Sequence, residues 1–223
     1  MSAGLVGRGK RRDRREHAWD RYWTEVHRGG QDHPGEFTQW AVPFLRSGRV
    51  RNVVDLGCGA GRDICYLLER GFTVTGVDCS AVAMELSAKA VSRLDPKTRG
   101  RGCVINDDLL DYLARLRPES VDAVHAAVTY QGLSDREVSE LFGEVHRVLV
   151  KGGLHLWSVR NESHPGKIHP EVVPPNFPHL GFAVPHRFFS LVDVSRFRGE
   201  RFEQLALQET TDFHSYMIAD RKR

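Results

Sequence analysis

Three glycines and two acidic residues in the first half of the chain have the types and spacing of a ligand-binding site. Gly57, Gly59 and Gly61 alternate in a short stretch that follows an apolar run containing Asp55. Glycine lets a backbone turn tightly and approach a ligand closely. A second apolar run ends in Asp78, and a carboxylate offers two acceptor oxygens, which suits the two hydroxyls of a ribose. The pattern predicts a loop and an acidic residue that bind a nucleoside-containing ligand.

This stretch departs from the dinucleotide-binding fingerprint. The spacing G-x-G-x-x-G needs a third glycine where Arg62 stands. Asp55, just ahead of the first glycine, would repel a pyrophosphate but could accept a hydrogen bond from an ammonium group. The residues therefore favour a ligand that carries a ribose and an ammonium group.

The elements that would position these residues alternate along the chain from about residue 50. Short apolar runs followed by helical periods are typical of a parallel α/β sheet. We expect strands at Val50–Leu56, Thr73–Val77, Cys103–Ile105, Val121–Val128, Leu154–Val159, Phe202–Glu209 and Phe213–Ala219, the last two as an antiparallel pair. We expect helices at Arg62–Glu69, Ala81–Ser92, Leu109–Leu116, Asp135–Leu149 and Leu191–Phe197.

The helix at Asp135–Leu149 has the strongest local signals. Ser134 and Glu137 have the spacing of a capping box, and apolar residues recur at helical intervals behind them. Lys151-Gly152-Gly153 predicts the end of the helix, since glycine adopts the left-handed conformation that follows many helices.

Composition indicates one soluble domain. The chain has 223 residues, 40% of them hydrophobic and 27% charged, and a formal net charge of +3. We see no apolar run long enough to cross a bilayer, so we expect no membrane contact. Its four cysteines form no metal or disulfide pattern, which favours a reducing, cytoplasmic setting.

Three segments fall outside the alternation. Residues 1–15 predict a flexible basic tail, because six lysines and arginines lie between Arg8 and Arg15. Residues 16–47 are rich in aromatic side chains and predict a helical cover. Residues 161–187 hold six prolines and predict a loop on the substrate side, because long loops in compact domains are usually functional.

The glycine loop, with Asp55 before it and Asp78 beyond it, resembles the core of class I S-adenosylmethionine-dependent methyltransferases. The resemblance extends from about Val50 to the end of the chain. It implies an α/β fold with a Rossmann-like, seven-stranded, mostly parallel sheet, helices on both faces and a C-terminal antiparallel hairpin, within a single domain over 16–223. It also implies S-adenosylmethionine as cofactor and methyl transfer by in-line displacement.

The resemblance implies a role for residues at the carboxyl ends of the strands, where open α/β sheets bind ligands. Asp55 would receive the cofactor's ammonium group, and Asp78 the ribose hydroxyls. Asp108 matches the acidic position that receives the adenine amine, although Asp107 beside it is a rival. The cofactor-binding residues that we expect are Asp55, Gly57, Cys58, Gly59, Gly61, Arg62, Asp78, Cys79, Asp108, Leu109 and Val128.

The acceptor side is less well defined. Trp19, Tyr22 and Trp23 share one helix face, which either packs on the sheet or walls the sulfonium by cation–π contact. We expect Trp19, Trp23, Arg160 and Asn161 on the substrate side. No motif singles out a catalytic residue. Tyr22, Tyr130 and His125 are candidates, with His27 beside them, and the sequence predicts no metal site.

Three short motifs look similar to small-molecule members of the class. They are Trp19-Asp20-x-x-Trp23, Gly61-Arg62-Asp63 and Ser158-Val159-Arg160-Asn161, and the thiopurine- and tellurite-type methyltransferases are nearest. Gln131 is a departure, since many members place a histidine there. We therefore expect a small-molecule methyl acceptor and no nucleic-acid partner. The alternatives are an RNA or protein methyltransferase that docks through the basic arm, and a non-catalytic S-adenosylmethionine-binding module. The acceptor's identity and the oligomeric state do not follow from the sequence.

Overall fold

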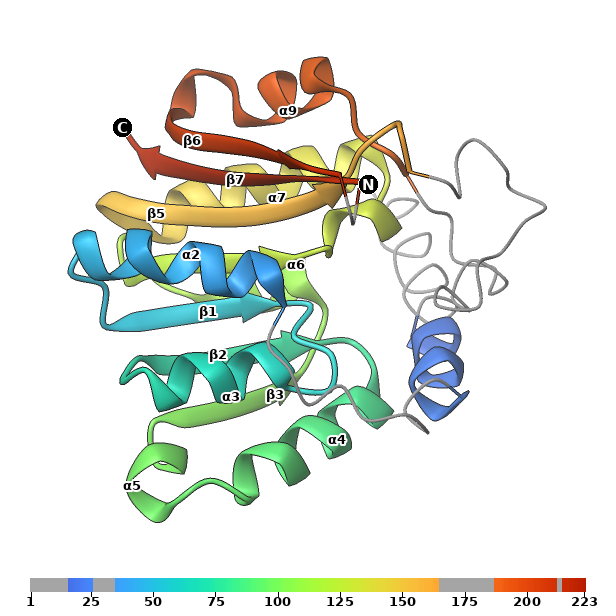
Figure 1. Ribbon diagram of the computed structural model, residues 1–223, viewed down its shortest axis with the longest axis vertical. Helices are drawn as coiled ribbons and strands as arrows, with labels where there is room; N and C mark the ends of the chain where they lie inside the picture. The colour runs from blue at the N-terminus through green and yellow to red at the C-terminus, as the bar shows by residue number, and fades with distance from the viewer. Residues whose placement is uncertain (1–15, 26–34, 165–186, 212–213) are drawn as a thin grey trace, which may run out of the picture.

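A seven-stranded sheet runs through the computed structural model, which describes residues 16–25, 35–164, 187–211 and 214–223 (Figure 1). The strand order is β3-β2-β1-β4-β5-β7-β6. The strands are β1 (Asn52–Leu56), β2 (Thr73–Asp78), β3 (Gly102–Asn106), β4 (Val121–Ala127), β5 (Leu149–Arg160), β6 (Phe202–Thr210) and β7 (Ser215–Lys222). β1 to β5 are parallel, and β7 runs antiparallel to both β5 and β6. The predicted sheet, with its C-terminal antiparallel hairpin, is confirmed.

Helices cover both faces of this sheet and bury one core layer on each. One layer lies beneath α2 (Glu36–Ser47), α3 (Arg62–Glu69) and α4 (Ala81–Ser92), which stand in front of the sheet in Figure 1. The other lies beneath α6 (Leu109–Arg115), α7 (Asp135–Val148) and α9 (Leu191–Arg198). A short helix, α5 (Pro96–Arg99), and two 3-10 turns, η2 (Tyr130–Gly132) and η4 (Gly199–Arg201), complete the described elements.

Local sequence explains why α7 forms where it does. Ser134 and Glu137 make the predicted capping box, so donors of the first turn are satisfied. The apolar side chains that recur at helical spacing are all buried on one face: Val138, Leu141, Phe142, Val145 and Val148. Phe142 packs edge-on against Trp157 of β5, with ring centroids 5.0 Å apart. This contact joins the helix to the middle of the sheet.

The predicted junction between α7 and β5 is wrong. Lys151-Gly152-Gly153 does not end the helix, which stops at Val148, and β5 begins at once with Leu149. Gly152 has a φ of 75° and lies where β5 shifts its register against β4. The glycines therefore accommodate an irregularity within a strand, a role that glycine also takes in sheets.

The predicted helical cover over 16–47 contains two described helical stretches, residues 16–25 and α2. Residues 1–15, with the predicted basic tail, and most of the predicted loop at 161–187 lie outside the described residues, as do His27 and the predicted start of the last strand at Phe213. Among the helices that the structure describes, none is long and apolar enough to cross a membrane.

Candidate active site

The glycine loop joins β1 to α3 in a conformation that only glycine adopts easily. Gly57, Gly59 and Gly61 have φ angles of 69°, 54° and 84°, in the left-handed region that a Cβ disfavours. A Cβ at Gly57 would also overlap the side chain of Thr129, and one at Gly61 would overlap Ser87. The loop is thus a close-packed turn, with neighbouring side chains against it and no room for a Cβ at these positions.

Asp78 lies at the end of β2 beside this loop. One carboxylate oxygen accepts from the backbone N–H of Gly59 at 3.0 Å, and the other accepts from Ser80 N–H at 2.9 Å. Burial raises the pKa of Asp78 to about 6, although these two N–H groups oppose the shift. Each oxygen keeps a second lone pair, so the carboxylate can accept two further hydrogen bonds. A ribose diol offers two such donors.

Asp55 forms part of a buried chain of polar contacts. Its Oδ1 lies 2.7 Å from Nδ1 of His125 on β4, and Nε2 of the same imidazole lies 3.1 Å from the Thr38 hydroxyl on α2. Asp55 is 2% exposed, and its second oxygen, Oδ2, has no hydrogen-bond partner among the described residues. A buried carboxylate oxygen without a donor is costly unless a ligand supplies one.

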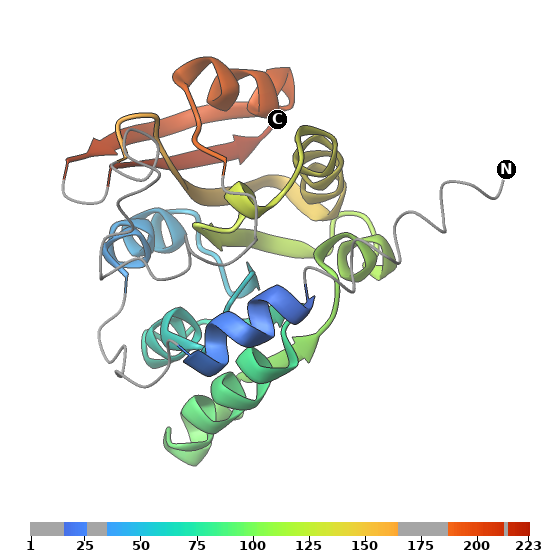
Figure 2. The same ribbon diagram turned by 90° about the vertical axis from the view of Figure 1, so that its right-hand side faces the viewer.

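The helical segment 16–25 covers the glycine loop. Figure 2 looks onto the carboxyl ends of the parallel strands and shows this segment lying across that side of the molecule, beside α4. Asp20 fastens it there: its Oδ1 accepts from the Ser80 hydroxyl at 2.6 Å and from Val82 N–H at 3.3 Å. The indole of Trp23 fills the space that a Cβ at Gly59 would need. Trp23 therefore lies at the glycine loop and also packs against the core layer beneath α2, α3 and α4. A cation–π contact with the sulfonium stays a prediction.

Tyr22, on the covering segment, lies near Arg160 at the end of β5. Arg160 ends β5, is 9% exposed and lies with Nη1 2.7 Å from Nε2 of His164. Burial lowers the pKa of Arg160 to about 10 and raises the pKa of Tyr22, although Arg160 and Arg62 nearby oppose that shift. Tyr22 therefore keeps its proton at neutral pH and is a hydrogen-bond donor rather than a base.

Two of the candidate catalytic residues, Tyr130 and His125, have buried positions. Tyr130 is fully buried in the core under α7, where its hydroxyl lies 2.7 Å from Nε2 of His155. His125 is also fully buried, and its two ring nitrogens contact Asp55 and Thr38. Neither side chain reaches the surface, so neither can take a proton from an acceptor molecule. The two side chains lie under opposite faces of the sheet, His125 beside α2 and Tyr130 under α7.

At the end of β3 the two rival aspartates have different surroundings. Asp108 caps α6, with Oδ1 accepting from Leu110 N–H at 2.9 Å and from Asp111 N–H at 3.4 Å. Asp107 is buried and forms an ion pair with Arg115. The cap uses one oxygen of Asp108, while the carboxylate of Asp107 is held by a cation.

The remaining predicted residues lie near the site in different ways. Cys58 points into the core beside Gly76, and burial raises the pKa of its thiol, so only its backbone faces the loop. Leu109 is half-buried at the start of α6, and Cys79 is half-buried after β2. Val128 is 40% exposed with a φ of 58°. The four lie at the carboxyl edge of the sheet.

On the acceptor side, Asn161 has a structural task. Its Nδ2 donates to Glu209 at 2.8 Å, and its Oδ1 accepts from Ser163. Trp19 packs edge-on against Tyr22, with ring centroids 5.5 Å apart. Gln131 lies at the same edge, 3% exposed, and neither polar atom of its side chain has a partner among the described residues.

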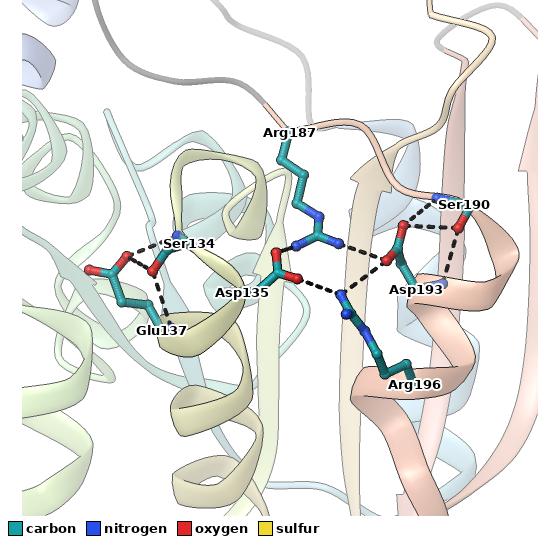
Figure 3. A network of polar contacts seen from close by, with 7 residues as sticks. All are labelled: Ser134, Asp135, Glu137, Arg187, Ser190, Asp193 and Arg196. Atoms are coloured by element: carbon teal, nitrogen blue, oxygen red, sulfur yellow. Dashed lines mark hydrogen bonds and ion pairs between the residues drawn. The ribbon is translucent and has the colours of Figure 1, made fainter.

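An ion-pair cluster fastens the chain that leads into α9 beside this edge (Figure 3). Arg187 pairs with Asp135 at the start of α7 and with Asp193 in the first turn of α9, the latter at 2.7 Å. Arg196 pairs with the same two acids, at 2.7 and 3.1 Å. The backbone N–H of Arg187 donates to Gln131 O at 2.9 Å. The cluster holds two helix N-termini together at the rim of the site.

Comparison with known proteins gives this geometry a family context. Residues 53–153 match the model of a family described as a methyltransferase domain. This match, which covers less than half of the chain, and the methyltransferase relatives below support a class I methyltransferase domain in this region. S-adenosylmethionine is the cofactor of this domain. In the residues that the structure describes, no cluster of three histidines, cysteines or acids could hold a metal ion.

The similar proteins include methyltransferases of more than one kind. The chain is 29% identical over 132 residues to an uncharacterized methyltransferase of Synechocystis, covering 56% of this chain and 53% of that one. It is 28% identical over 139 residues to human glycine N-methyltransferase, covering 58% and 47%. It thus spans about half the length of these relatives. A Methanosarcina mazei S-adenosylmethionine-dependent methyltransferase shares its fold, with a TM-score of 0.64, 20% identity and coverage of 81% and 97%. The resemblance to thiopurine- and tellurite-type enzymes stays a prediction.

The residues of the methyltransferase domain fit this cofactor. The glycine loop turns with left-handed φ angles that need glycine, Asp78 retains lone pairs for a diol, and the buried Oδ2 of Asp55 lacks a donor among the described residues. The sequence had identified all of these residues. It gave Asp20 no role beyond its place in a motif, and it missed Thr38 and the placement of His125, because the contact partners of these residues are distant in sequence.

Proposed function

We propose that this protein transfers a methyl group from S-adenosylmethionine to a small-molecule acceptor held at the carboxyl ends of β4 and β5. The observation that carries the proposal is the cover over the loop: Asp20 and Trp23 fasten the segment 16–25 over the glycine loop. A cover over the reacting centre excludes water and suits a small acceptor better than a macromolecular chain. The human relative's name, glycine N-methyltransferase, describes a small acceptor with an amine.

In this proposal the cofactor-side residues bind and orient. Asp78 accepts from the ribose hydroxyls, Asp55 through Oδ2 accepts from the ammonium group, and Asp108 receives the adenine amine with its second oxygen. Arg62, whose guanidinium is 33% exposed at the start of α3, meets the cofactor's carboxylate as a charge-assisted partner. Trp23 walls the site above Gly59.

On the acceptor side, position rather than acid–base chemistry does most of the work. S-adenosylmethionine supplies a methyl group already activated by the positive charge on its sulfur. The protein must hold the acceptor atom in line, within about 3–3.5 Å. Tyr22 keeps its proton, so it orients an acceptor by donating a hydrogen bond. An acceptor with a neutral nitrogen or a thiolate needs no general base.

The proposal is tested with the full-length chain, by calorimetry and a methyl-transfer assay. S-adenosylhomocysteine should bind, and turnover should appear with members of a panel of small amines, amino acids, thiols and phenols. RNA and protein fractions serve as competing acceptors, and a chain lacking residues 1–15 serves as the matched control. The small-molecule assignment would be refuted if the full-length chain methylates RNA or protein but no small molecule, and if the chain lacking residues 1–15 loses that activity. Binding without any turnover would indicate a non-catalytic module.

A further inference from the structure

Three polar side chains from three separate elements form a continuous buried chain under the glycine loop. Thr38 of α2, His125 of β4 and Asp55 of β1 are 0%, 0% and 2% exposed. The two contacts measure 3.1 Å and 2.7 Å. The ring of Phe37 stacks on the imidazole, with centroids 5.0 Å apart and an interplanar angle of 26°. The imidazole is therefore fixed in position and in rotation.

The charges around this chain favour a protonated imidazole. Burial disfavours the imidazolium, but Asp55 and Asp63 outweigh that effect, and the pKa of His125 is raised. Arg62 beside Asp63 opposes them weakly. Asp55 itself faces His125, Asp63 and Arg62, with Asp78 and the Cys58 thiol on its loop side. Burial raises the pKa of Asp55, and His125 is the first of the groups that oppose this.

We propose that His125 is a positioning residue for cofactor binding. Anchored by Thr38, it holds Oδ1 of Asp55 and supplies the positive charge that keeps this buried carboxylate ionised, which leaves Oδ2 to accept from the cofactor's ammonium group. The inference rests on the role of Asp55 in the proposed function. It assigns His125 a task in binding rather than in proton transfer, and it connects α2 to the cofactor site through Thr38.

The test measures the dissociation constant of S-adenosylhomocysteine by calorimetry between pH 6.5 and 8.5. The range begins above the pKa of about 6 of Asp78, so that this carboxylate is mostly ionised throughout. If the imidazolium keeps Asp55 ionised over this range, the wild-type constant should change by less than about twofold. In His125→Leu the loss of the imidazolium raises the pKa of Asp55, so affinity should fall as pH is lowered, by at most about tenfold per pH unit for one proton.

A matched control comes from the neighbouring strand. His155 is equally buried, but it contacts Tyr130 on the opposite face of the sheet. His155→Leu removes the same ring at comparable cost to packing, and its affinity should follow the wild-type pH profile. Should His125→Leu fail to fold, His125→Asn keeps an N–H donor toward Asp55 without the charge. That variant should bind nearly normally at pH 8.5 and lose affinity toward pH 6.5.

The outcomes separate the two claims. Asp55→Asn should weaken binding by roughly tenfold or more at every pH, because a charge-assisted hydrogen bond is lost. If it binds as the wild type does, the proposed role of Asp55 is wrong. If Asp55→Asn weakens binding while both His125 variants keep the wild-type profile, Asp55 retains its role and the inference about His125 is overturned. A pH-dependent loss in His125→Leu and His125→Asn alone supports it.

Discussion

Replacing Asp78 with asparagine should remove both cofactor affinity and one component of the pH dependence of stability. Asp78 is 8% exposed and holds the ends of the glycine loop and α4 through its two carboxylate oxygens. Burial raises its pKa from 3.8 to about 6. The native state therefore binds this proton more tightly than the unfolded chain does. The ionised carboxyl costs stability above pH 6, and stability is recovered as pH falls toward 4.

The magnitude follows from the shift. A difference of about 2 pKa units at about 1.36 kcal/mol each gives roughly 3 kcal/mol between full protonation and full ionisation. Between pH 8 and pH 5 the share of Asp78 amounts to about 1.4 kcal/mol, because the native-state carboxyl is mostly protonated at pH 5 and the unfolded one is still ionised. Asp78→Asn cannot ionise, so this component should vanish.

Urea unfolding from pH 5 to pH 8 measures it. The wild type should gain about 1.4 kcal/mol of unfolding free energy relative to Asp78→Asn when the pH is lowered from 8 to 5. The lost hydrogen bonds add an offset that is the same at both pH values. Asp220 is the control: it is fully buried beneath Trp157, and burial also raises its pKa to about 6. Asp220→Asn should show the same stability signature.

Only the binding assay separates these two carboxyls. Asp78→Asn should lower S-adenosylhomocysteine affinity by about 10- to 150-fold, the equivalent of one charge-assisted hydrogen bond, whereas Asp220→Asn should bind as the wild type does. A pH-independent stability difference for Asp78→Asn would refute the burial argument. Unchanged affinity would refute the assignment of the ribose site.

Three further substitutions test other parts of the site. Gly59→Ala should abolish cofactor binding and destabilise by more than about 1–2 kcal/mol, while Gly71→Ala, with φ of 94° but nothing within 4 Å, should cost only the backbone strain. Asp20→Ala should weaken S-adenosylhomocysteine binding by about 5- to 30-fold in calorimetry, since it unfastens the cover; Glu25→Ala, on the same helical stretch, should not. Gln131→Leu should keep or raise stability by about 1–2 kcal/mol in urea, because its buried amide has no partner among the described residues, and leave that affinity unchanged.

Features encoded by neighbouring residues could be predicted from the sequence. The bounds of α3 and α4 agree with the prediction, because Gly61 begins one helix and Ser80 caps the other. The glycine loop and Asp78 likewise follow from short motifs. In contrast, Lys151-Gly152-Gly153 has the composition of a helix end and serves instead as a strand irregularity. Turn chemistry alone does not decide between these two uses of glycine.

The direction of side chains in β4 could not be predicted, for a physical reason. A strand covered by helices on both faces is apolar throughout, so no alternation of polar and apolar residues marks its two faces. His125 thus lies under α2 with Asp55, and Tyr130, just beyond the strand, lies under α7. Both had been candidates for the same catalytic task on chemistry alone. The folded structure places His125 and Tyr130 on opposite sides of the sheet, and the sequence alone does not state this.

The same reasoning explains why the cofactor follows from the sequence more readily than the acceptor. Most of the proposed cofactor-side groups lie within two short stretches, 55–62 and 78–79, each a strand end with its following loop, and Asp108, Leu109 and Val128 follow two further strands. The groups proposed on the acceptor side come from distant parts of the chain, for example Tyr22 from the segment 16–25 and Arg160 from the end of β5. Their chemistry is therefore a product of topology. A change of acceptor specificity therefore needs substitutions at positions that are distant in the sequence. The contiguous cofactor motifs need no substitution for such a change.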